Sequence, residues 1–321
     1  MKSNDTWSSV LHKGPATFLN SPVMEPDQNK IKEEGVKAAI LGVPFDGTTI
    51  TRTGSSMGPR KIRDVSSMTI PYHFDYDVNI METYNIRDCG DVDVKIGDAF
   101  GTIERGGENV LEILKGGALP ILVGGDHVIT VTSTRALNQF DPTKKYGFIL
   151  FDSHLDTAED VGGDPWNHCC PVPRTMELDC FDPKNAVIIG AGGPMNPKAE
   201  LEYVKEKGIS LYTMRDIYKK GIQEVVEEAI KIASDGTDGV YISFDMDSLE
   251  ASQTPGTCAP TPGGIMVREM IQAIELLGQV DLVGFDVVEI APPYDQSDIT
   301  AITATRFLVD MLASRAKYLN K

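Results

Sequence analysis

The segment YGFILFDSHLD, residues 146–156, joins an apolar run to a short series of ionisable side chains. Residues 146–152 are typical of a buried strand in a parallel sheet, because such strands are covered on both faces and read as continuous apolar runs. Directly after this run, Asp152, His154 and Asp156 alternate along the chain, which places their side chains on one side of an extended backbone. Two carboxylates and an imidazole in this position indicate a functional site at the end of a core strand.

Seven further segments have the composition of short strands. They are rich in apolar and β-branched residues, and stretches with helical periodicity separate them. The expected strands, besides residues 146–152, are residues 36–45, 84–92, 119–125, 186–192, 209–214, 239–247 and 281–290. The expected helices include residues 101–116, 221–234 and 267–278, and one that begins near Pro59. Strands that alternate with helices predict an α/β fold of three αβα layers around a parallel eight-stranded sheet.

The length and composition of the chain favour one large domain. It has 321 residues, of which 41% are hydrophobic and 24% charged, which is enough for a sizeable core. Residues 1–35 are polar and contain three prolines, so we expect an irregular N-terminal arm. Residues 36–321 contain no repeat, low-complexity segment or linker, and we interpret them as a single catalytic domain.

The charge and cysteine content limit the partners and the location. The formal net charge of −17 argues against nucleic acid as a partner, because phosphate binding needs a basic surface. A negative surface instead attracts small cations. Five irregularly spaced cysteines fit reduced thiols better than a disulfide framework. Because no apolar run reaches membrane-spanning length and the N-terminus has no apolar targeting segment, we expect a cytoplasmic protein without membrane contact.

Acids and imidazoles also follow three other expected strands. His127 comes shortly after residues 119–125, Asp245 and Asp247 end another strand, and Glu289 ends the last one. In open parallel sheets, ligands gather beyond the carboxyl ends of the strands. We therefore expect these side chains to meet those of residues 152–156 at one edge of the sheet.

Such a group of buried carboxylates requires cations. Burying them uncompensated costs several kcal/mol per ion, and no Lys or Arg lies in these segments. Because one metal with an open site takes about three protein ligands, six ligands predict two divalent ions with bridging carboxylates. The expected ligands are His127, Asp152, His154, Asp156, Asp245 and Asp247. Mixed carboxylate and imidazole ligation favours Mn²⁺, with Ni²⁺, Fe²⁺ or Zn²⁺ as alternatives.

Several stretches, taken together, resemble the ureohydrolases, the family of arginase and agmatinase. They are VGGDHVIT (123–130), FDSHLD (151–156), SFDMD (243–247), TPGTCAPTPGG (254–264) and GFDVVEIAPPYD (284–295). The similarity extends over roughly residues 36–315 and is closest to the agmatinase-like branch. It implies the fold shared by arginases and deacetylases, a homo-trimer or hexamer, and hydrolysis of a C–N bond in a guanidino compound to urea and an amine.

The resemblance also implies a role for each site residue. One metal would be held by His127, Asp152, Asp156 and Asp245. The other would be held by Asp152, His154, Asp245 and Asp247, so that Asp152 and Asp245 bridge the two. Glu289 matches the glutamate that anchors the guanidinium, and His168 matches the histidine that exchanges protons with solvent. Asp156, beside the nucleophile, could relay the proton to the leaving amine.

The chemistry itself needs such a site. A guanidinium is delocalised, always charged and a poor electrophile, so its hydrolysis requires hydroxide at neutral pH. Two metals that share a water lower its pKa enough to supply that hydroxide. A carboxylate that accepts two N–H groups of the guanidinium in a fork would hold the guanidinium carbon above the hydroxide.

The loop around His168 departs from the family pattern and leaves the substrate tail open. Agmatinase-like relatives usually read H-G-T-x-F-R there, whereas this chain reads HCCPVPR over residues 168–174. Trp166 could stack on a cationic substrate or simply pack the loop. Arg174 could bind a substrate carboxylate or have a structural role. The candidate substrates are agmatine, a guanidino acid such as 4-guanidinobutyrate or 3-guanidinopropionate, and guanidine itself; the absence of a recognisable α-amino-acid-binding segment disfavours arginine.

Two readings from other classes compete with this one. Deacetylase-like enzymes of similar fold use one zinc and carry a tandem histidine pair, but no two of the five histidines here are adjacent. The chain could also be an inactive support subunit of a hetero-oligomer. The complete set of metal-ligand residue types argues against this reading. Metal content per chain separates these readings: two ions for a ureohydrolase, one for a deacetylase, none for a support subunit.

Overall fold

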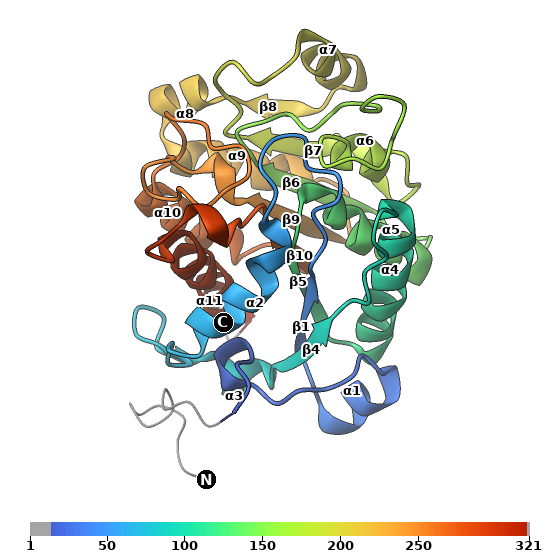
Figure 1. Cartoon of the computed structure of the whole chain (residues 1–321), viewed down its shortest axis with the longest axis vertical. Coiled ribbons are helices and arrows are strands. Elements are labelled where there is room, and N and C mark those ends of the chain that lie inside the picture. Colours follow the sequence, from blue (N-terminus) through green and yellow to red (C-terminus); the bar gives the residue numbers. More distant parts are fainter. Residues whose placement is uncertain (1–13, 320–321) are drawn as a thin grey trace.

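The computed structural model describes residues 14–319 of the chain. Within these residues, eight strands form one parallel sheet in the order β4-β1-β5-β10-β9-β6-β7-β8. Helices pack on both faces of the sheet (Figure 1), with α4 and α5 on one face and α2, α10 and α11 on the other. This arrangement confirms the predicted three-layer fold with a parallel eight-stranded sheet.

Each predicted strand segment overlaps one strand of the sheet. The strands are β1 (Ala38–Val43), β4 (Arg87–Asp91), β5 (Leu119–Gly124), β6 (Tyr146–Phe151), β7 (Phe181–Ile189), β8 (Ser210–Tyr212), β9 (Gly239–Asp245) and β10 (Leu282–Val288). A small antiparallel pair outside this sheet consists of β2 (Tyr72–His73) and β3 (Val78–Asn79). The central strands β1, β5, β6 and β9 are buried almost throughout, as their apolar sequences predict.

The four expected helices are present as α2, α4, α9 and α10. The helices of the described chain are α1 (Gln28–Glu34), α2 (Gly58–Ser66), α3 (Ile80–Tyr84), α4 (Ala99–Gly116), α5 (Thr130–Phe140), α6 (Pro171–Met176), α7 (Lys198–Lys207), α8 (Met214–Lys220), α9 (Ile222–Ala233), α10 (Val267–Leu277) and α11 (Ile299–Leu319). None of them combines the length and apolar character that a membrane crossing requires.

The N-terminal arm is more ordered than its composition predicts, in the part that the structure describes. Residues 28–34 form α1, so the expectation of an irregular arm is wrong for this segment. The carboxylate of Asp27 caps the helix by accepting two backbone N–H groups, and Gly35 ends it in the left-handed conformation that glycine favours. Ile31 is fully buried, and Phe18 earlier in the arm also lies in the core. Residues 1–13 lie outside the described part of the chain.

The order of the strands places the candidate site. β5, β10, β9 and β6 are neighbours in the sheet and parallel, so their carboxyl ends meet at one edge. β10, which comes last in the sequence, lies between β5 and β9. The predicted site residues lie at or just beyond the carboxyl ends of these four strands.

Candidate metal centre

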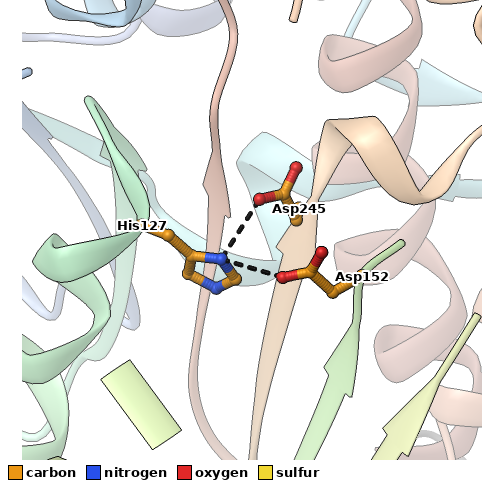
Figure 2. Close-up of side chains that lie close together, drawn as sticks. All are labelled: His127, Asp152 and Asp245. Atoms are coloured by element: carbon orange, nitrogen blue, oxygen red, sulfur yellow. Dashed lines mark ion pairs between the residues drawn. The ribbon is translucent and has the colours of Figure 1, made fainter. Parts of the chain in front are cut away.

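The first group of expected ligands converges on one ring nitrogen of His127. His127 follows β5, and its Nδ1 lies 3.1 Å from Asp152 Oδ2, 3.0 Å from Asp156 Oδ2 and 3.1 Å from Asp245 Oδ2. Figure 2 shows one ring nitrogen of His127 facing the carboxylates of Asp152 and Asp245, which come from the ends of β6 and β9. His127, Asp152 and Asp245 have the geometry of a group that could hold one metal ion.

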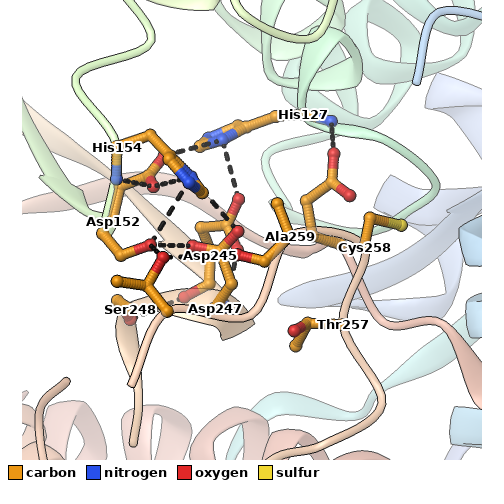
Figure 3. Close-up of polar contacts among 12 residues, drawn as sticks. His127, Asp152, His154, Asp245, Asp247, Ser248, Thr257, Cys258 and Ala259 are labelled. Carbon is orange, nitrogen blue, oxygen red and sulfur yellow. Dashed lines mark hydrogen bonds and ion pairs between the residues drawn. The ribbon is translucent and has the colours of Figure 1, made fainter. Parts of the chain in front are cut away.

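The second group of ligands shares Asp152 with the first. His154 Nδ1 lies 3.3 Å from Asp152 Oδ1 and 3.3 Å from Asp247 Oδ2, and these three residues could hold a second ion. Asp152 thus turns one oxygen towards each imidazole, which is the arrangement that a bridging carboxylate requires. Asp245 joins the first group, while its Oδ1 accepts the backbone N–H of Asp247 at 2.7 Å (Figure 3). Its bridging role stays a prediction.

The donor set fits divalent cations. His127 Nδ1 and Asp152 Oδ2 are buried atoms that have no hydrogen-bond partner within residues 14–319, although they face each other across 3.1 Å. Burial raises the pKa of Asp245 well above its ordinary value, and the charges of Asp247 and Asp152 add to this rise. Cations between the carboxylates would remove this repulsion and satisfy the open ligand atoms.

A buried hydrogen-bond chain holds the imidazole of His127 in place. Its Nε2 lies 3.0 Å from Ser243 Oγ, and this hydroxyl donates to Asp286 Oδ1 at 2.6 Å. Tyr241 donates its hydroxyl to the other oxygen of Asp286 at 2.7 Å. Metal-binding histidines usually donate their second ring N–H in this way, which fixes the tautomer and raises the basicity of the ligating nitrogen. The sequence analysis missed Ser243 and Asp286, although both lie in the family-like stretches around β9 and β10.

Asp286→Asn is expected to weaken metal binding roughly 10- to 100-fold without touching a metal, because it disturbs the chain that orients His127. The measurement is competition with a chromophoric chelator, with circular dichroism to show that the variant folds. Asp281→Asn is the matched control, since Asp281 lies next to the same strand but is exposed and paired with Arg315. If the Asp286→Asn variant folds and its affinity for the metal is unchanged, Asp286 does not support the metal centre.

Glu289 and His168 adjoin the metal-ligand groups. Glu289 Oε1 accepts the backbone N–H of His127 at 2.8 Å and lies 3.3 Å from His168 Nδ1. Burial works to raise the pKa of Glu289, but the hydrogen bond and the positive charge of His168, with smaller contributions from neighbouring groups, together lower it. Glu289 and Asp156 also have φ angles of 62° and 49°, a left-handed backbone conformation that is uncommon outside glycine and gathers at functional sites.

A cavity of about 110 Å³ opens onto the metal-ligand groups. Its lining includes His154, Asp156, His168, Asp245, Asp247 and Glu289. The structure therefore brings together all the residues predicted for catalysis and most of those predicted for metal binding. His127 and Asp152 are buried directly behind this lining.

Trp166 and Arg174 do not line this cavity. The Trp166 ring packs 4.7 Å from the Phe100 ring on α4, and Arg174 on α6 forms an ion pair with Glu177, which directly follows that helix. These contacts agree with the alternative roles of the two residues, which are loop packing for Trp166 and a structural ion pair for Arg174. Glu200, at the start of α7, does line the cavity. Sequence reasoning missed Glu200, and no local signal distinguishes it from the other acids of α7.

The family model that matches this chain is described as "Arginase family" and covers residues 36–313. Two relatives support it. Guanidinopropionase from Pseudomonas aeruginosa is 32% identical over 305 residues, which cover 95% of this chain and 92% of the relative. N(1)-aminopropylagmatine ureohydrolase from Thermococcus kodakarensis is 33% identical over 303 residues, which cover 94% of this chain and 96% of the relative.

The structural comparison agrees with the sequence comparison. The solved structure of proclavaminate amidino hydrolase from Streptomyces clavuligerus matches with a TM-score of 0.85 at 27% identity, covering 96% of this chain and 99% of that one. Together with the two candidate metal groups, these matches confirm the resemblance that the sequence motifs predicted. The chain belongs to the arginase family of ureohydrolases.

Proposed function

We propose that the protein hydrolyses a small cationic guanidino compound to urea and an amine, with agmatine, which would yield putrescine, as the best candidate. The observation that carries this proposal is the convergence of two metal-ligand groups with Glu289 and His168 at one cavity. Hydroxide formation, guanidinium anchoring and proton transfer are the three tasks of the reaction, and residues suited to each lie together here.

Two divalent ions, when bound, would lower the pKa of a shared water and supply the nucleophile. Glu289 would orient the substrate, because its Oε1 is already fixed by the backbone N–H of His127 and its buried Oε2 has no donor among the described residues. A guanidinium offers N–H donors in the fork geometry that suits such a carboxylate. His168 accepts the backbone N–H of Ile50 at Nε2, which leaves its Nδ1–H for Glu289 and holds the ring at the cavity wall. Proton delivery to the leaving amine falls to Asp156 and His168.

The ligand chemistry favours Mn²⁺. Four of the six expected ligands are carboxylates, which suit Mn²⁺, and the two imidazoles leave Ni²⁺ as the main alternative. We expect about two tightly held divalent ions per chain in active protein, as one metal with an open site takes about three protein ligands. Elemental analysis of purified, active protein is the measurement; one ion per chain would favour a deacetylase-like centre, and none would favour a support subunit.

Guanidino acids are the second candidate substrates. The similarity to guanidinopropionase favours them, whereas the similarity to N(1)-aminopropylagmatine ureohydrolase favours a substrate with an amine tail. Guanidine itself stays a third candidate, because the cavity beside the metal ligands is small. An assembly of three or six copies and a cytoplasmic location stay predictions.

A substrate panel tests the proposal. Protein loaded with Mn²⁺ or Ni²⁺ is incubated with agmatine, 4-guanidinobutyrate, 3-guanidinopropionate, arginine and guanidine, and urea is measured. We expect urea from agmatine at the highest kcat/KM. Absence of urea with every substrate and both metals would contradict the proposed function.

A further inference from the structure

A second cavity adjoins the one at the metal ligands. It has a volume of about 500 Å³, and its walls share Ile50, Cys169, Pro197 and Glu200 with the first. The rest of its lining comes mainly from residues 157–162, after β6, and from α7. We call the two the inner cavity and the outer cavity. Because they share these walls, a substrate anchored at the metal ligands would extend its tail past Glu200 into the outer cavity.

Glu200 is the acidic residue that both cavities share, and hydrogen bonds fix its position. Its Oε2 accepts the backbone N–H of Thr157 at 3.2 Å, and the Thr157 hydroxyl donates to the Glu200 carbonyl at 3.1 Å. Thr157 directly follows Asp156, so Glu200 has a fixed position relative to the site of the reaction. No hydrogen bond from a donor within residues 14–319 reaches its other carboxylate oxygen, Oε1, and Glu200 lines both cavities.

The charges around this route select against an anionic tail. Glu159 and Asp160 add two more carboxylates to the outer cavity, and no Lys or Arg among the described residues lines either cavity. Arg174, which could have bound a substrate carboxylate, is paired with Glu177. A guanidino acid would therefore place its carboxylate beside Glu200 without a cationic partner, which costs affinity through repulsion and an unmet charge.

We propose that Glu200 recognises an ammonium group in the tail of the substrate and so selects guanidino amines over guanidino acids. The ammonium donates to the free oxygen of Glu200, a charge-assisted hydrogen bond. The outer cavity then has room for a further aminoalkyl segment, so a guanidino polyamine is accepted as well as agmatine. This inference rests on the proposed function for its reaction, but the tail site itself is defined by the two cavities.

The test compares Glu200→Gln with Glu202→Gln in the full-length, metal-loaded protein. Glu202 is the matched control, because it lies on the same helix but pairs with Lys198 at the surface. Losing one charge-assisted hydrogen bond is expected to lower kcat/KM for agmatine and for N1-aminopropylagmatine roughly 10- to 100-fold in Glu200→Gln, mainly through KM. The ratio of kcat/KM for 4-guanidinobutyrate to that for agmatine is expected to rise. Glu200→Lys should shift this ratio further in the same direction.

A binding measurement separates this inference from the proposed function. Calorimetry with 1,4-diaminobutane and 4-aminobutyrate, which carry the two kinds of tail, needs no turnover. We expect wild-type protein and Glu202→Gln to prefer the diamine, and Glu200→Gln to lose that preference. If no urea is released but the calorimetric preference for the diamine is retained, the proposed reaction is contradicted and the role of Glu200 is not. Equal losses on amine and acid substrates, or an unchanged preference in both assays, would overturn the role of Glu200.

Discussion

Asp245→Asn is expected to abolish urea release, with kcat lowered by about 10³-fold or more, and to reduce the bound metal below two ions per chain. Asp245 Oδ2 lies 3.1 Å from His127 Nδ1 at the end of β9, and its carboxylate belongs to a candidate metal group. An amide is a weaker, uncharged ligand, and the metals supply several kcal/mol of charge stabilisation to the transition state, which corresponds to this loss of rate. Urea assays and elemental analysis of the same preparation are the measurements.

The effect of Asp245→Asn on thermal stability should change sign with the metal. With ions bound, the variant should unfold at a lower temperature, because a ligand that stabilises the folded state binds less tightly. With a chelator present, the variant should be at least as stable as the wild type, since Asp247 and Asp152 no longer repel a third buried carboxylate.

Asp238→Asn is the control for both measurements, because Asp238 precedes β9 at its opposite end and pairs with Lys144 at the surface. Unchanged metal content in Asp245→Asn would contradict its place among the ligands. A loss of stability that persists in chelator would show that the residue acts on the fold instead.

Glu289→Gln is expected to leave the metal content unchanged and to weaken substrate binding. The glutamine oxygen can still accept the backbone N–H of His127, so the local structure is preserved. The guanidinium, however, loses one or two charge-assisted hydrogen bonds, each worth roughly 1.5–3 kcal/mol, so kcat/KM should fall about 10- to 10⁴-fold. Steady-state kinetics on agmatine and metal analysis together check this expectation.

Loss of metal in Glu289→Gln would show that Glu289 is a metal ligand. Activity within about threefold of the wild type would show that it does not bind the substrate. The φ angle of 62° at this residue makes the control important, because substitutions at strained positions can also disturb the backbone. Near-ultraviolet circular dichroism of the variant shows whether the loop keeps its structure.

Much of the fold could be predicted because its signals are local. The apolar run of residues 146–151 predicts β6 on its own, and similar runs predict the other strands of the sheet. The end of each run then predicts where ligands gather, so Asp152 and Asp245 could be placed together without coordinates. The helix α1 was missed because its order depends on Ile31 packing against α4, a contact between distant segments.

The residues that meet the substrate tail could not be predicted, because they too depend on contacts between distant segments. Trp166 packs on Phe100, which lies far from it in the sequence, and its ring is not part of the cavity lining. Glu200 is held by Thr157, 43 residues earlier in the chain. Neither contact leaves a periodicity or a motif in the sequence, because each depends on how loops fold back over the sheet edge.

The position of β10 determines when the centre can assemble. β5, which precedes His127, and β9, which ends at Asp245, are held apart by one strand spacing that only residues 282–288 fill. During synthesis the N-terminal strands leave the ribosome first, and we expect His127 and Asp245 to reach their 3.1 Å separation only after this final strand inserts. We therefore expect ion loading to follow completion of the sheet, and a nascent chain that ends before Leu282 to lack a competent pair of sites.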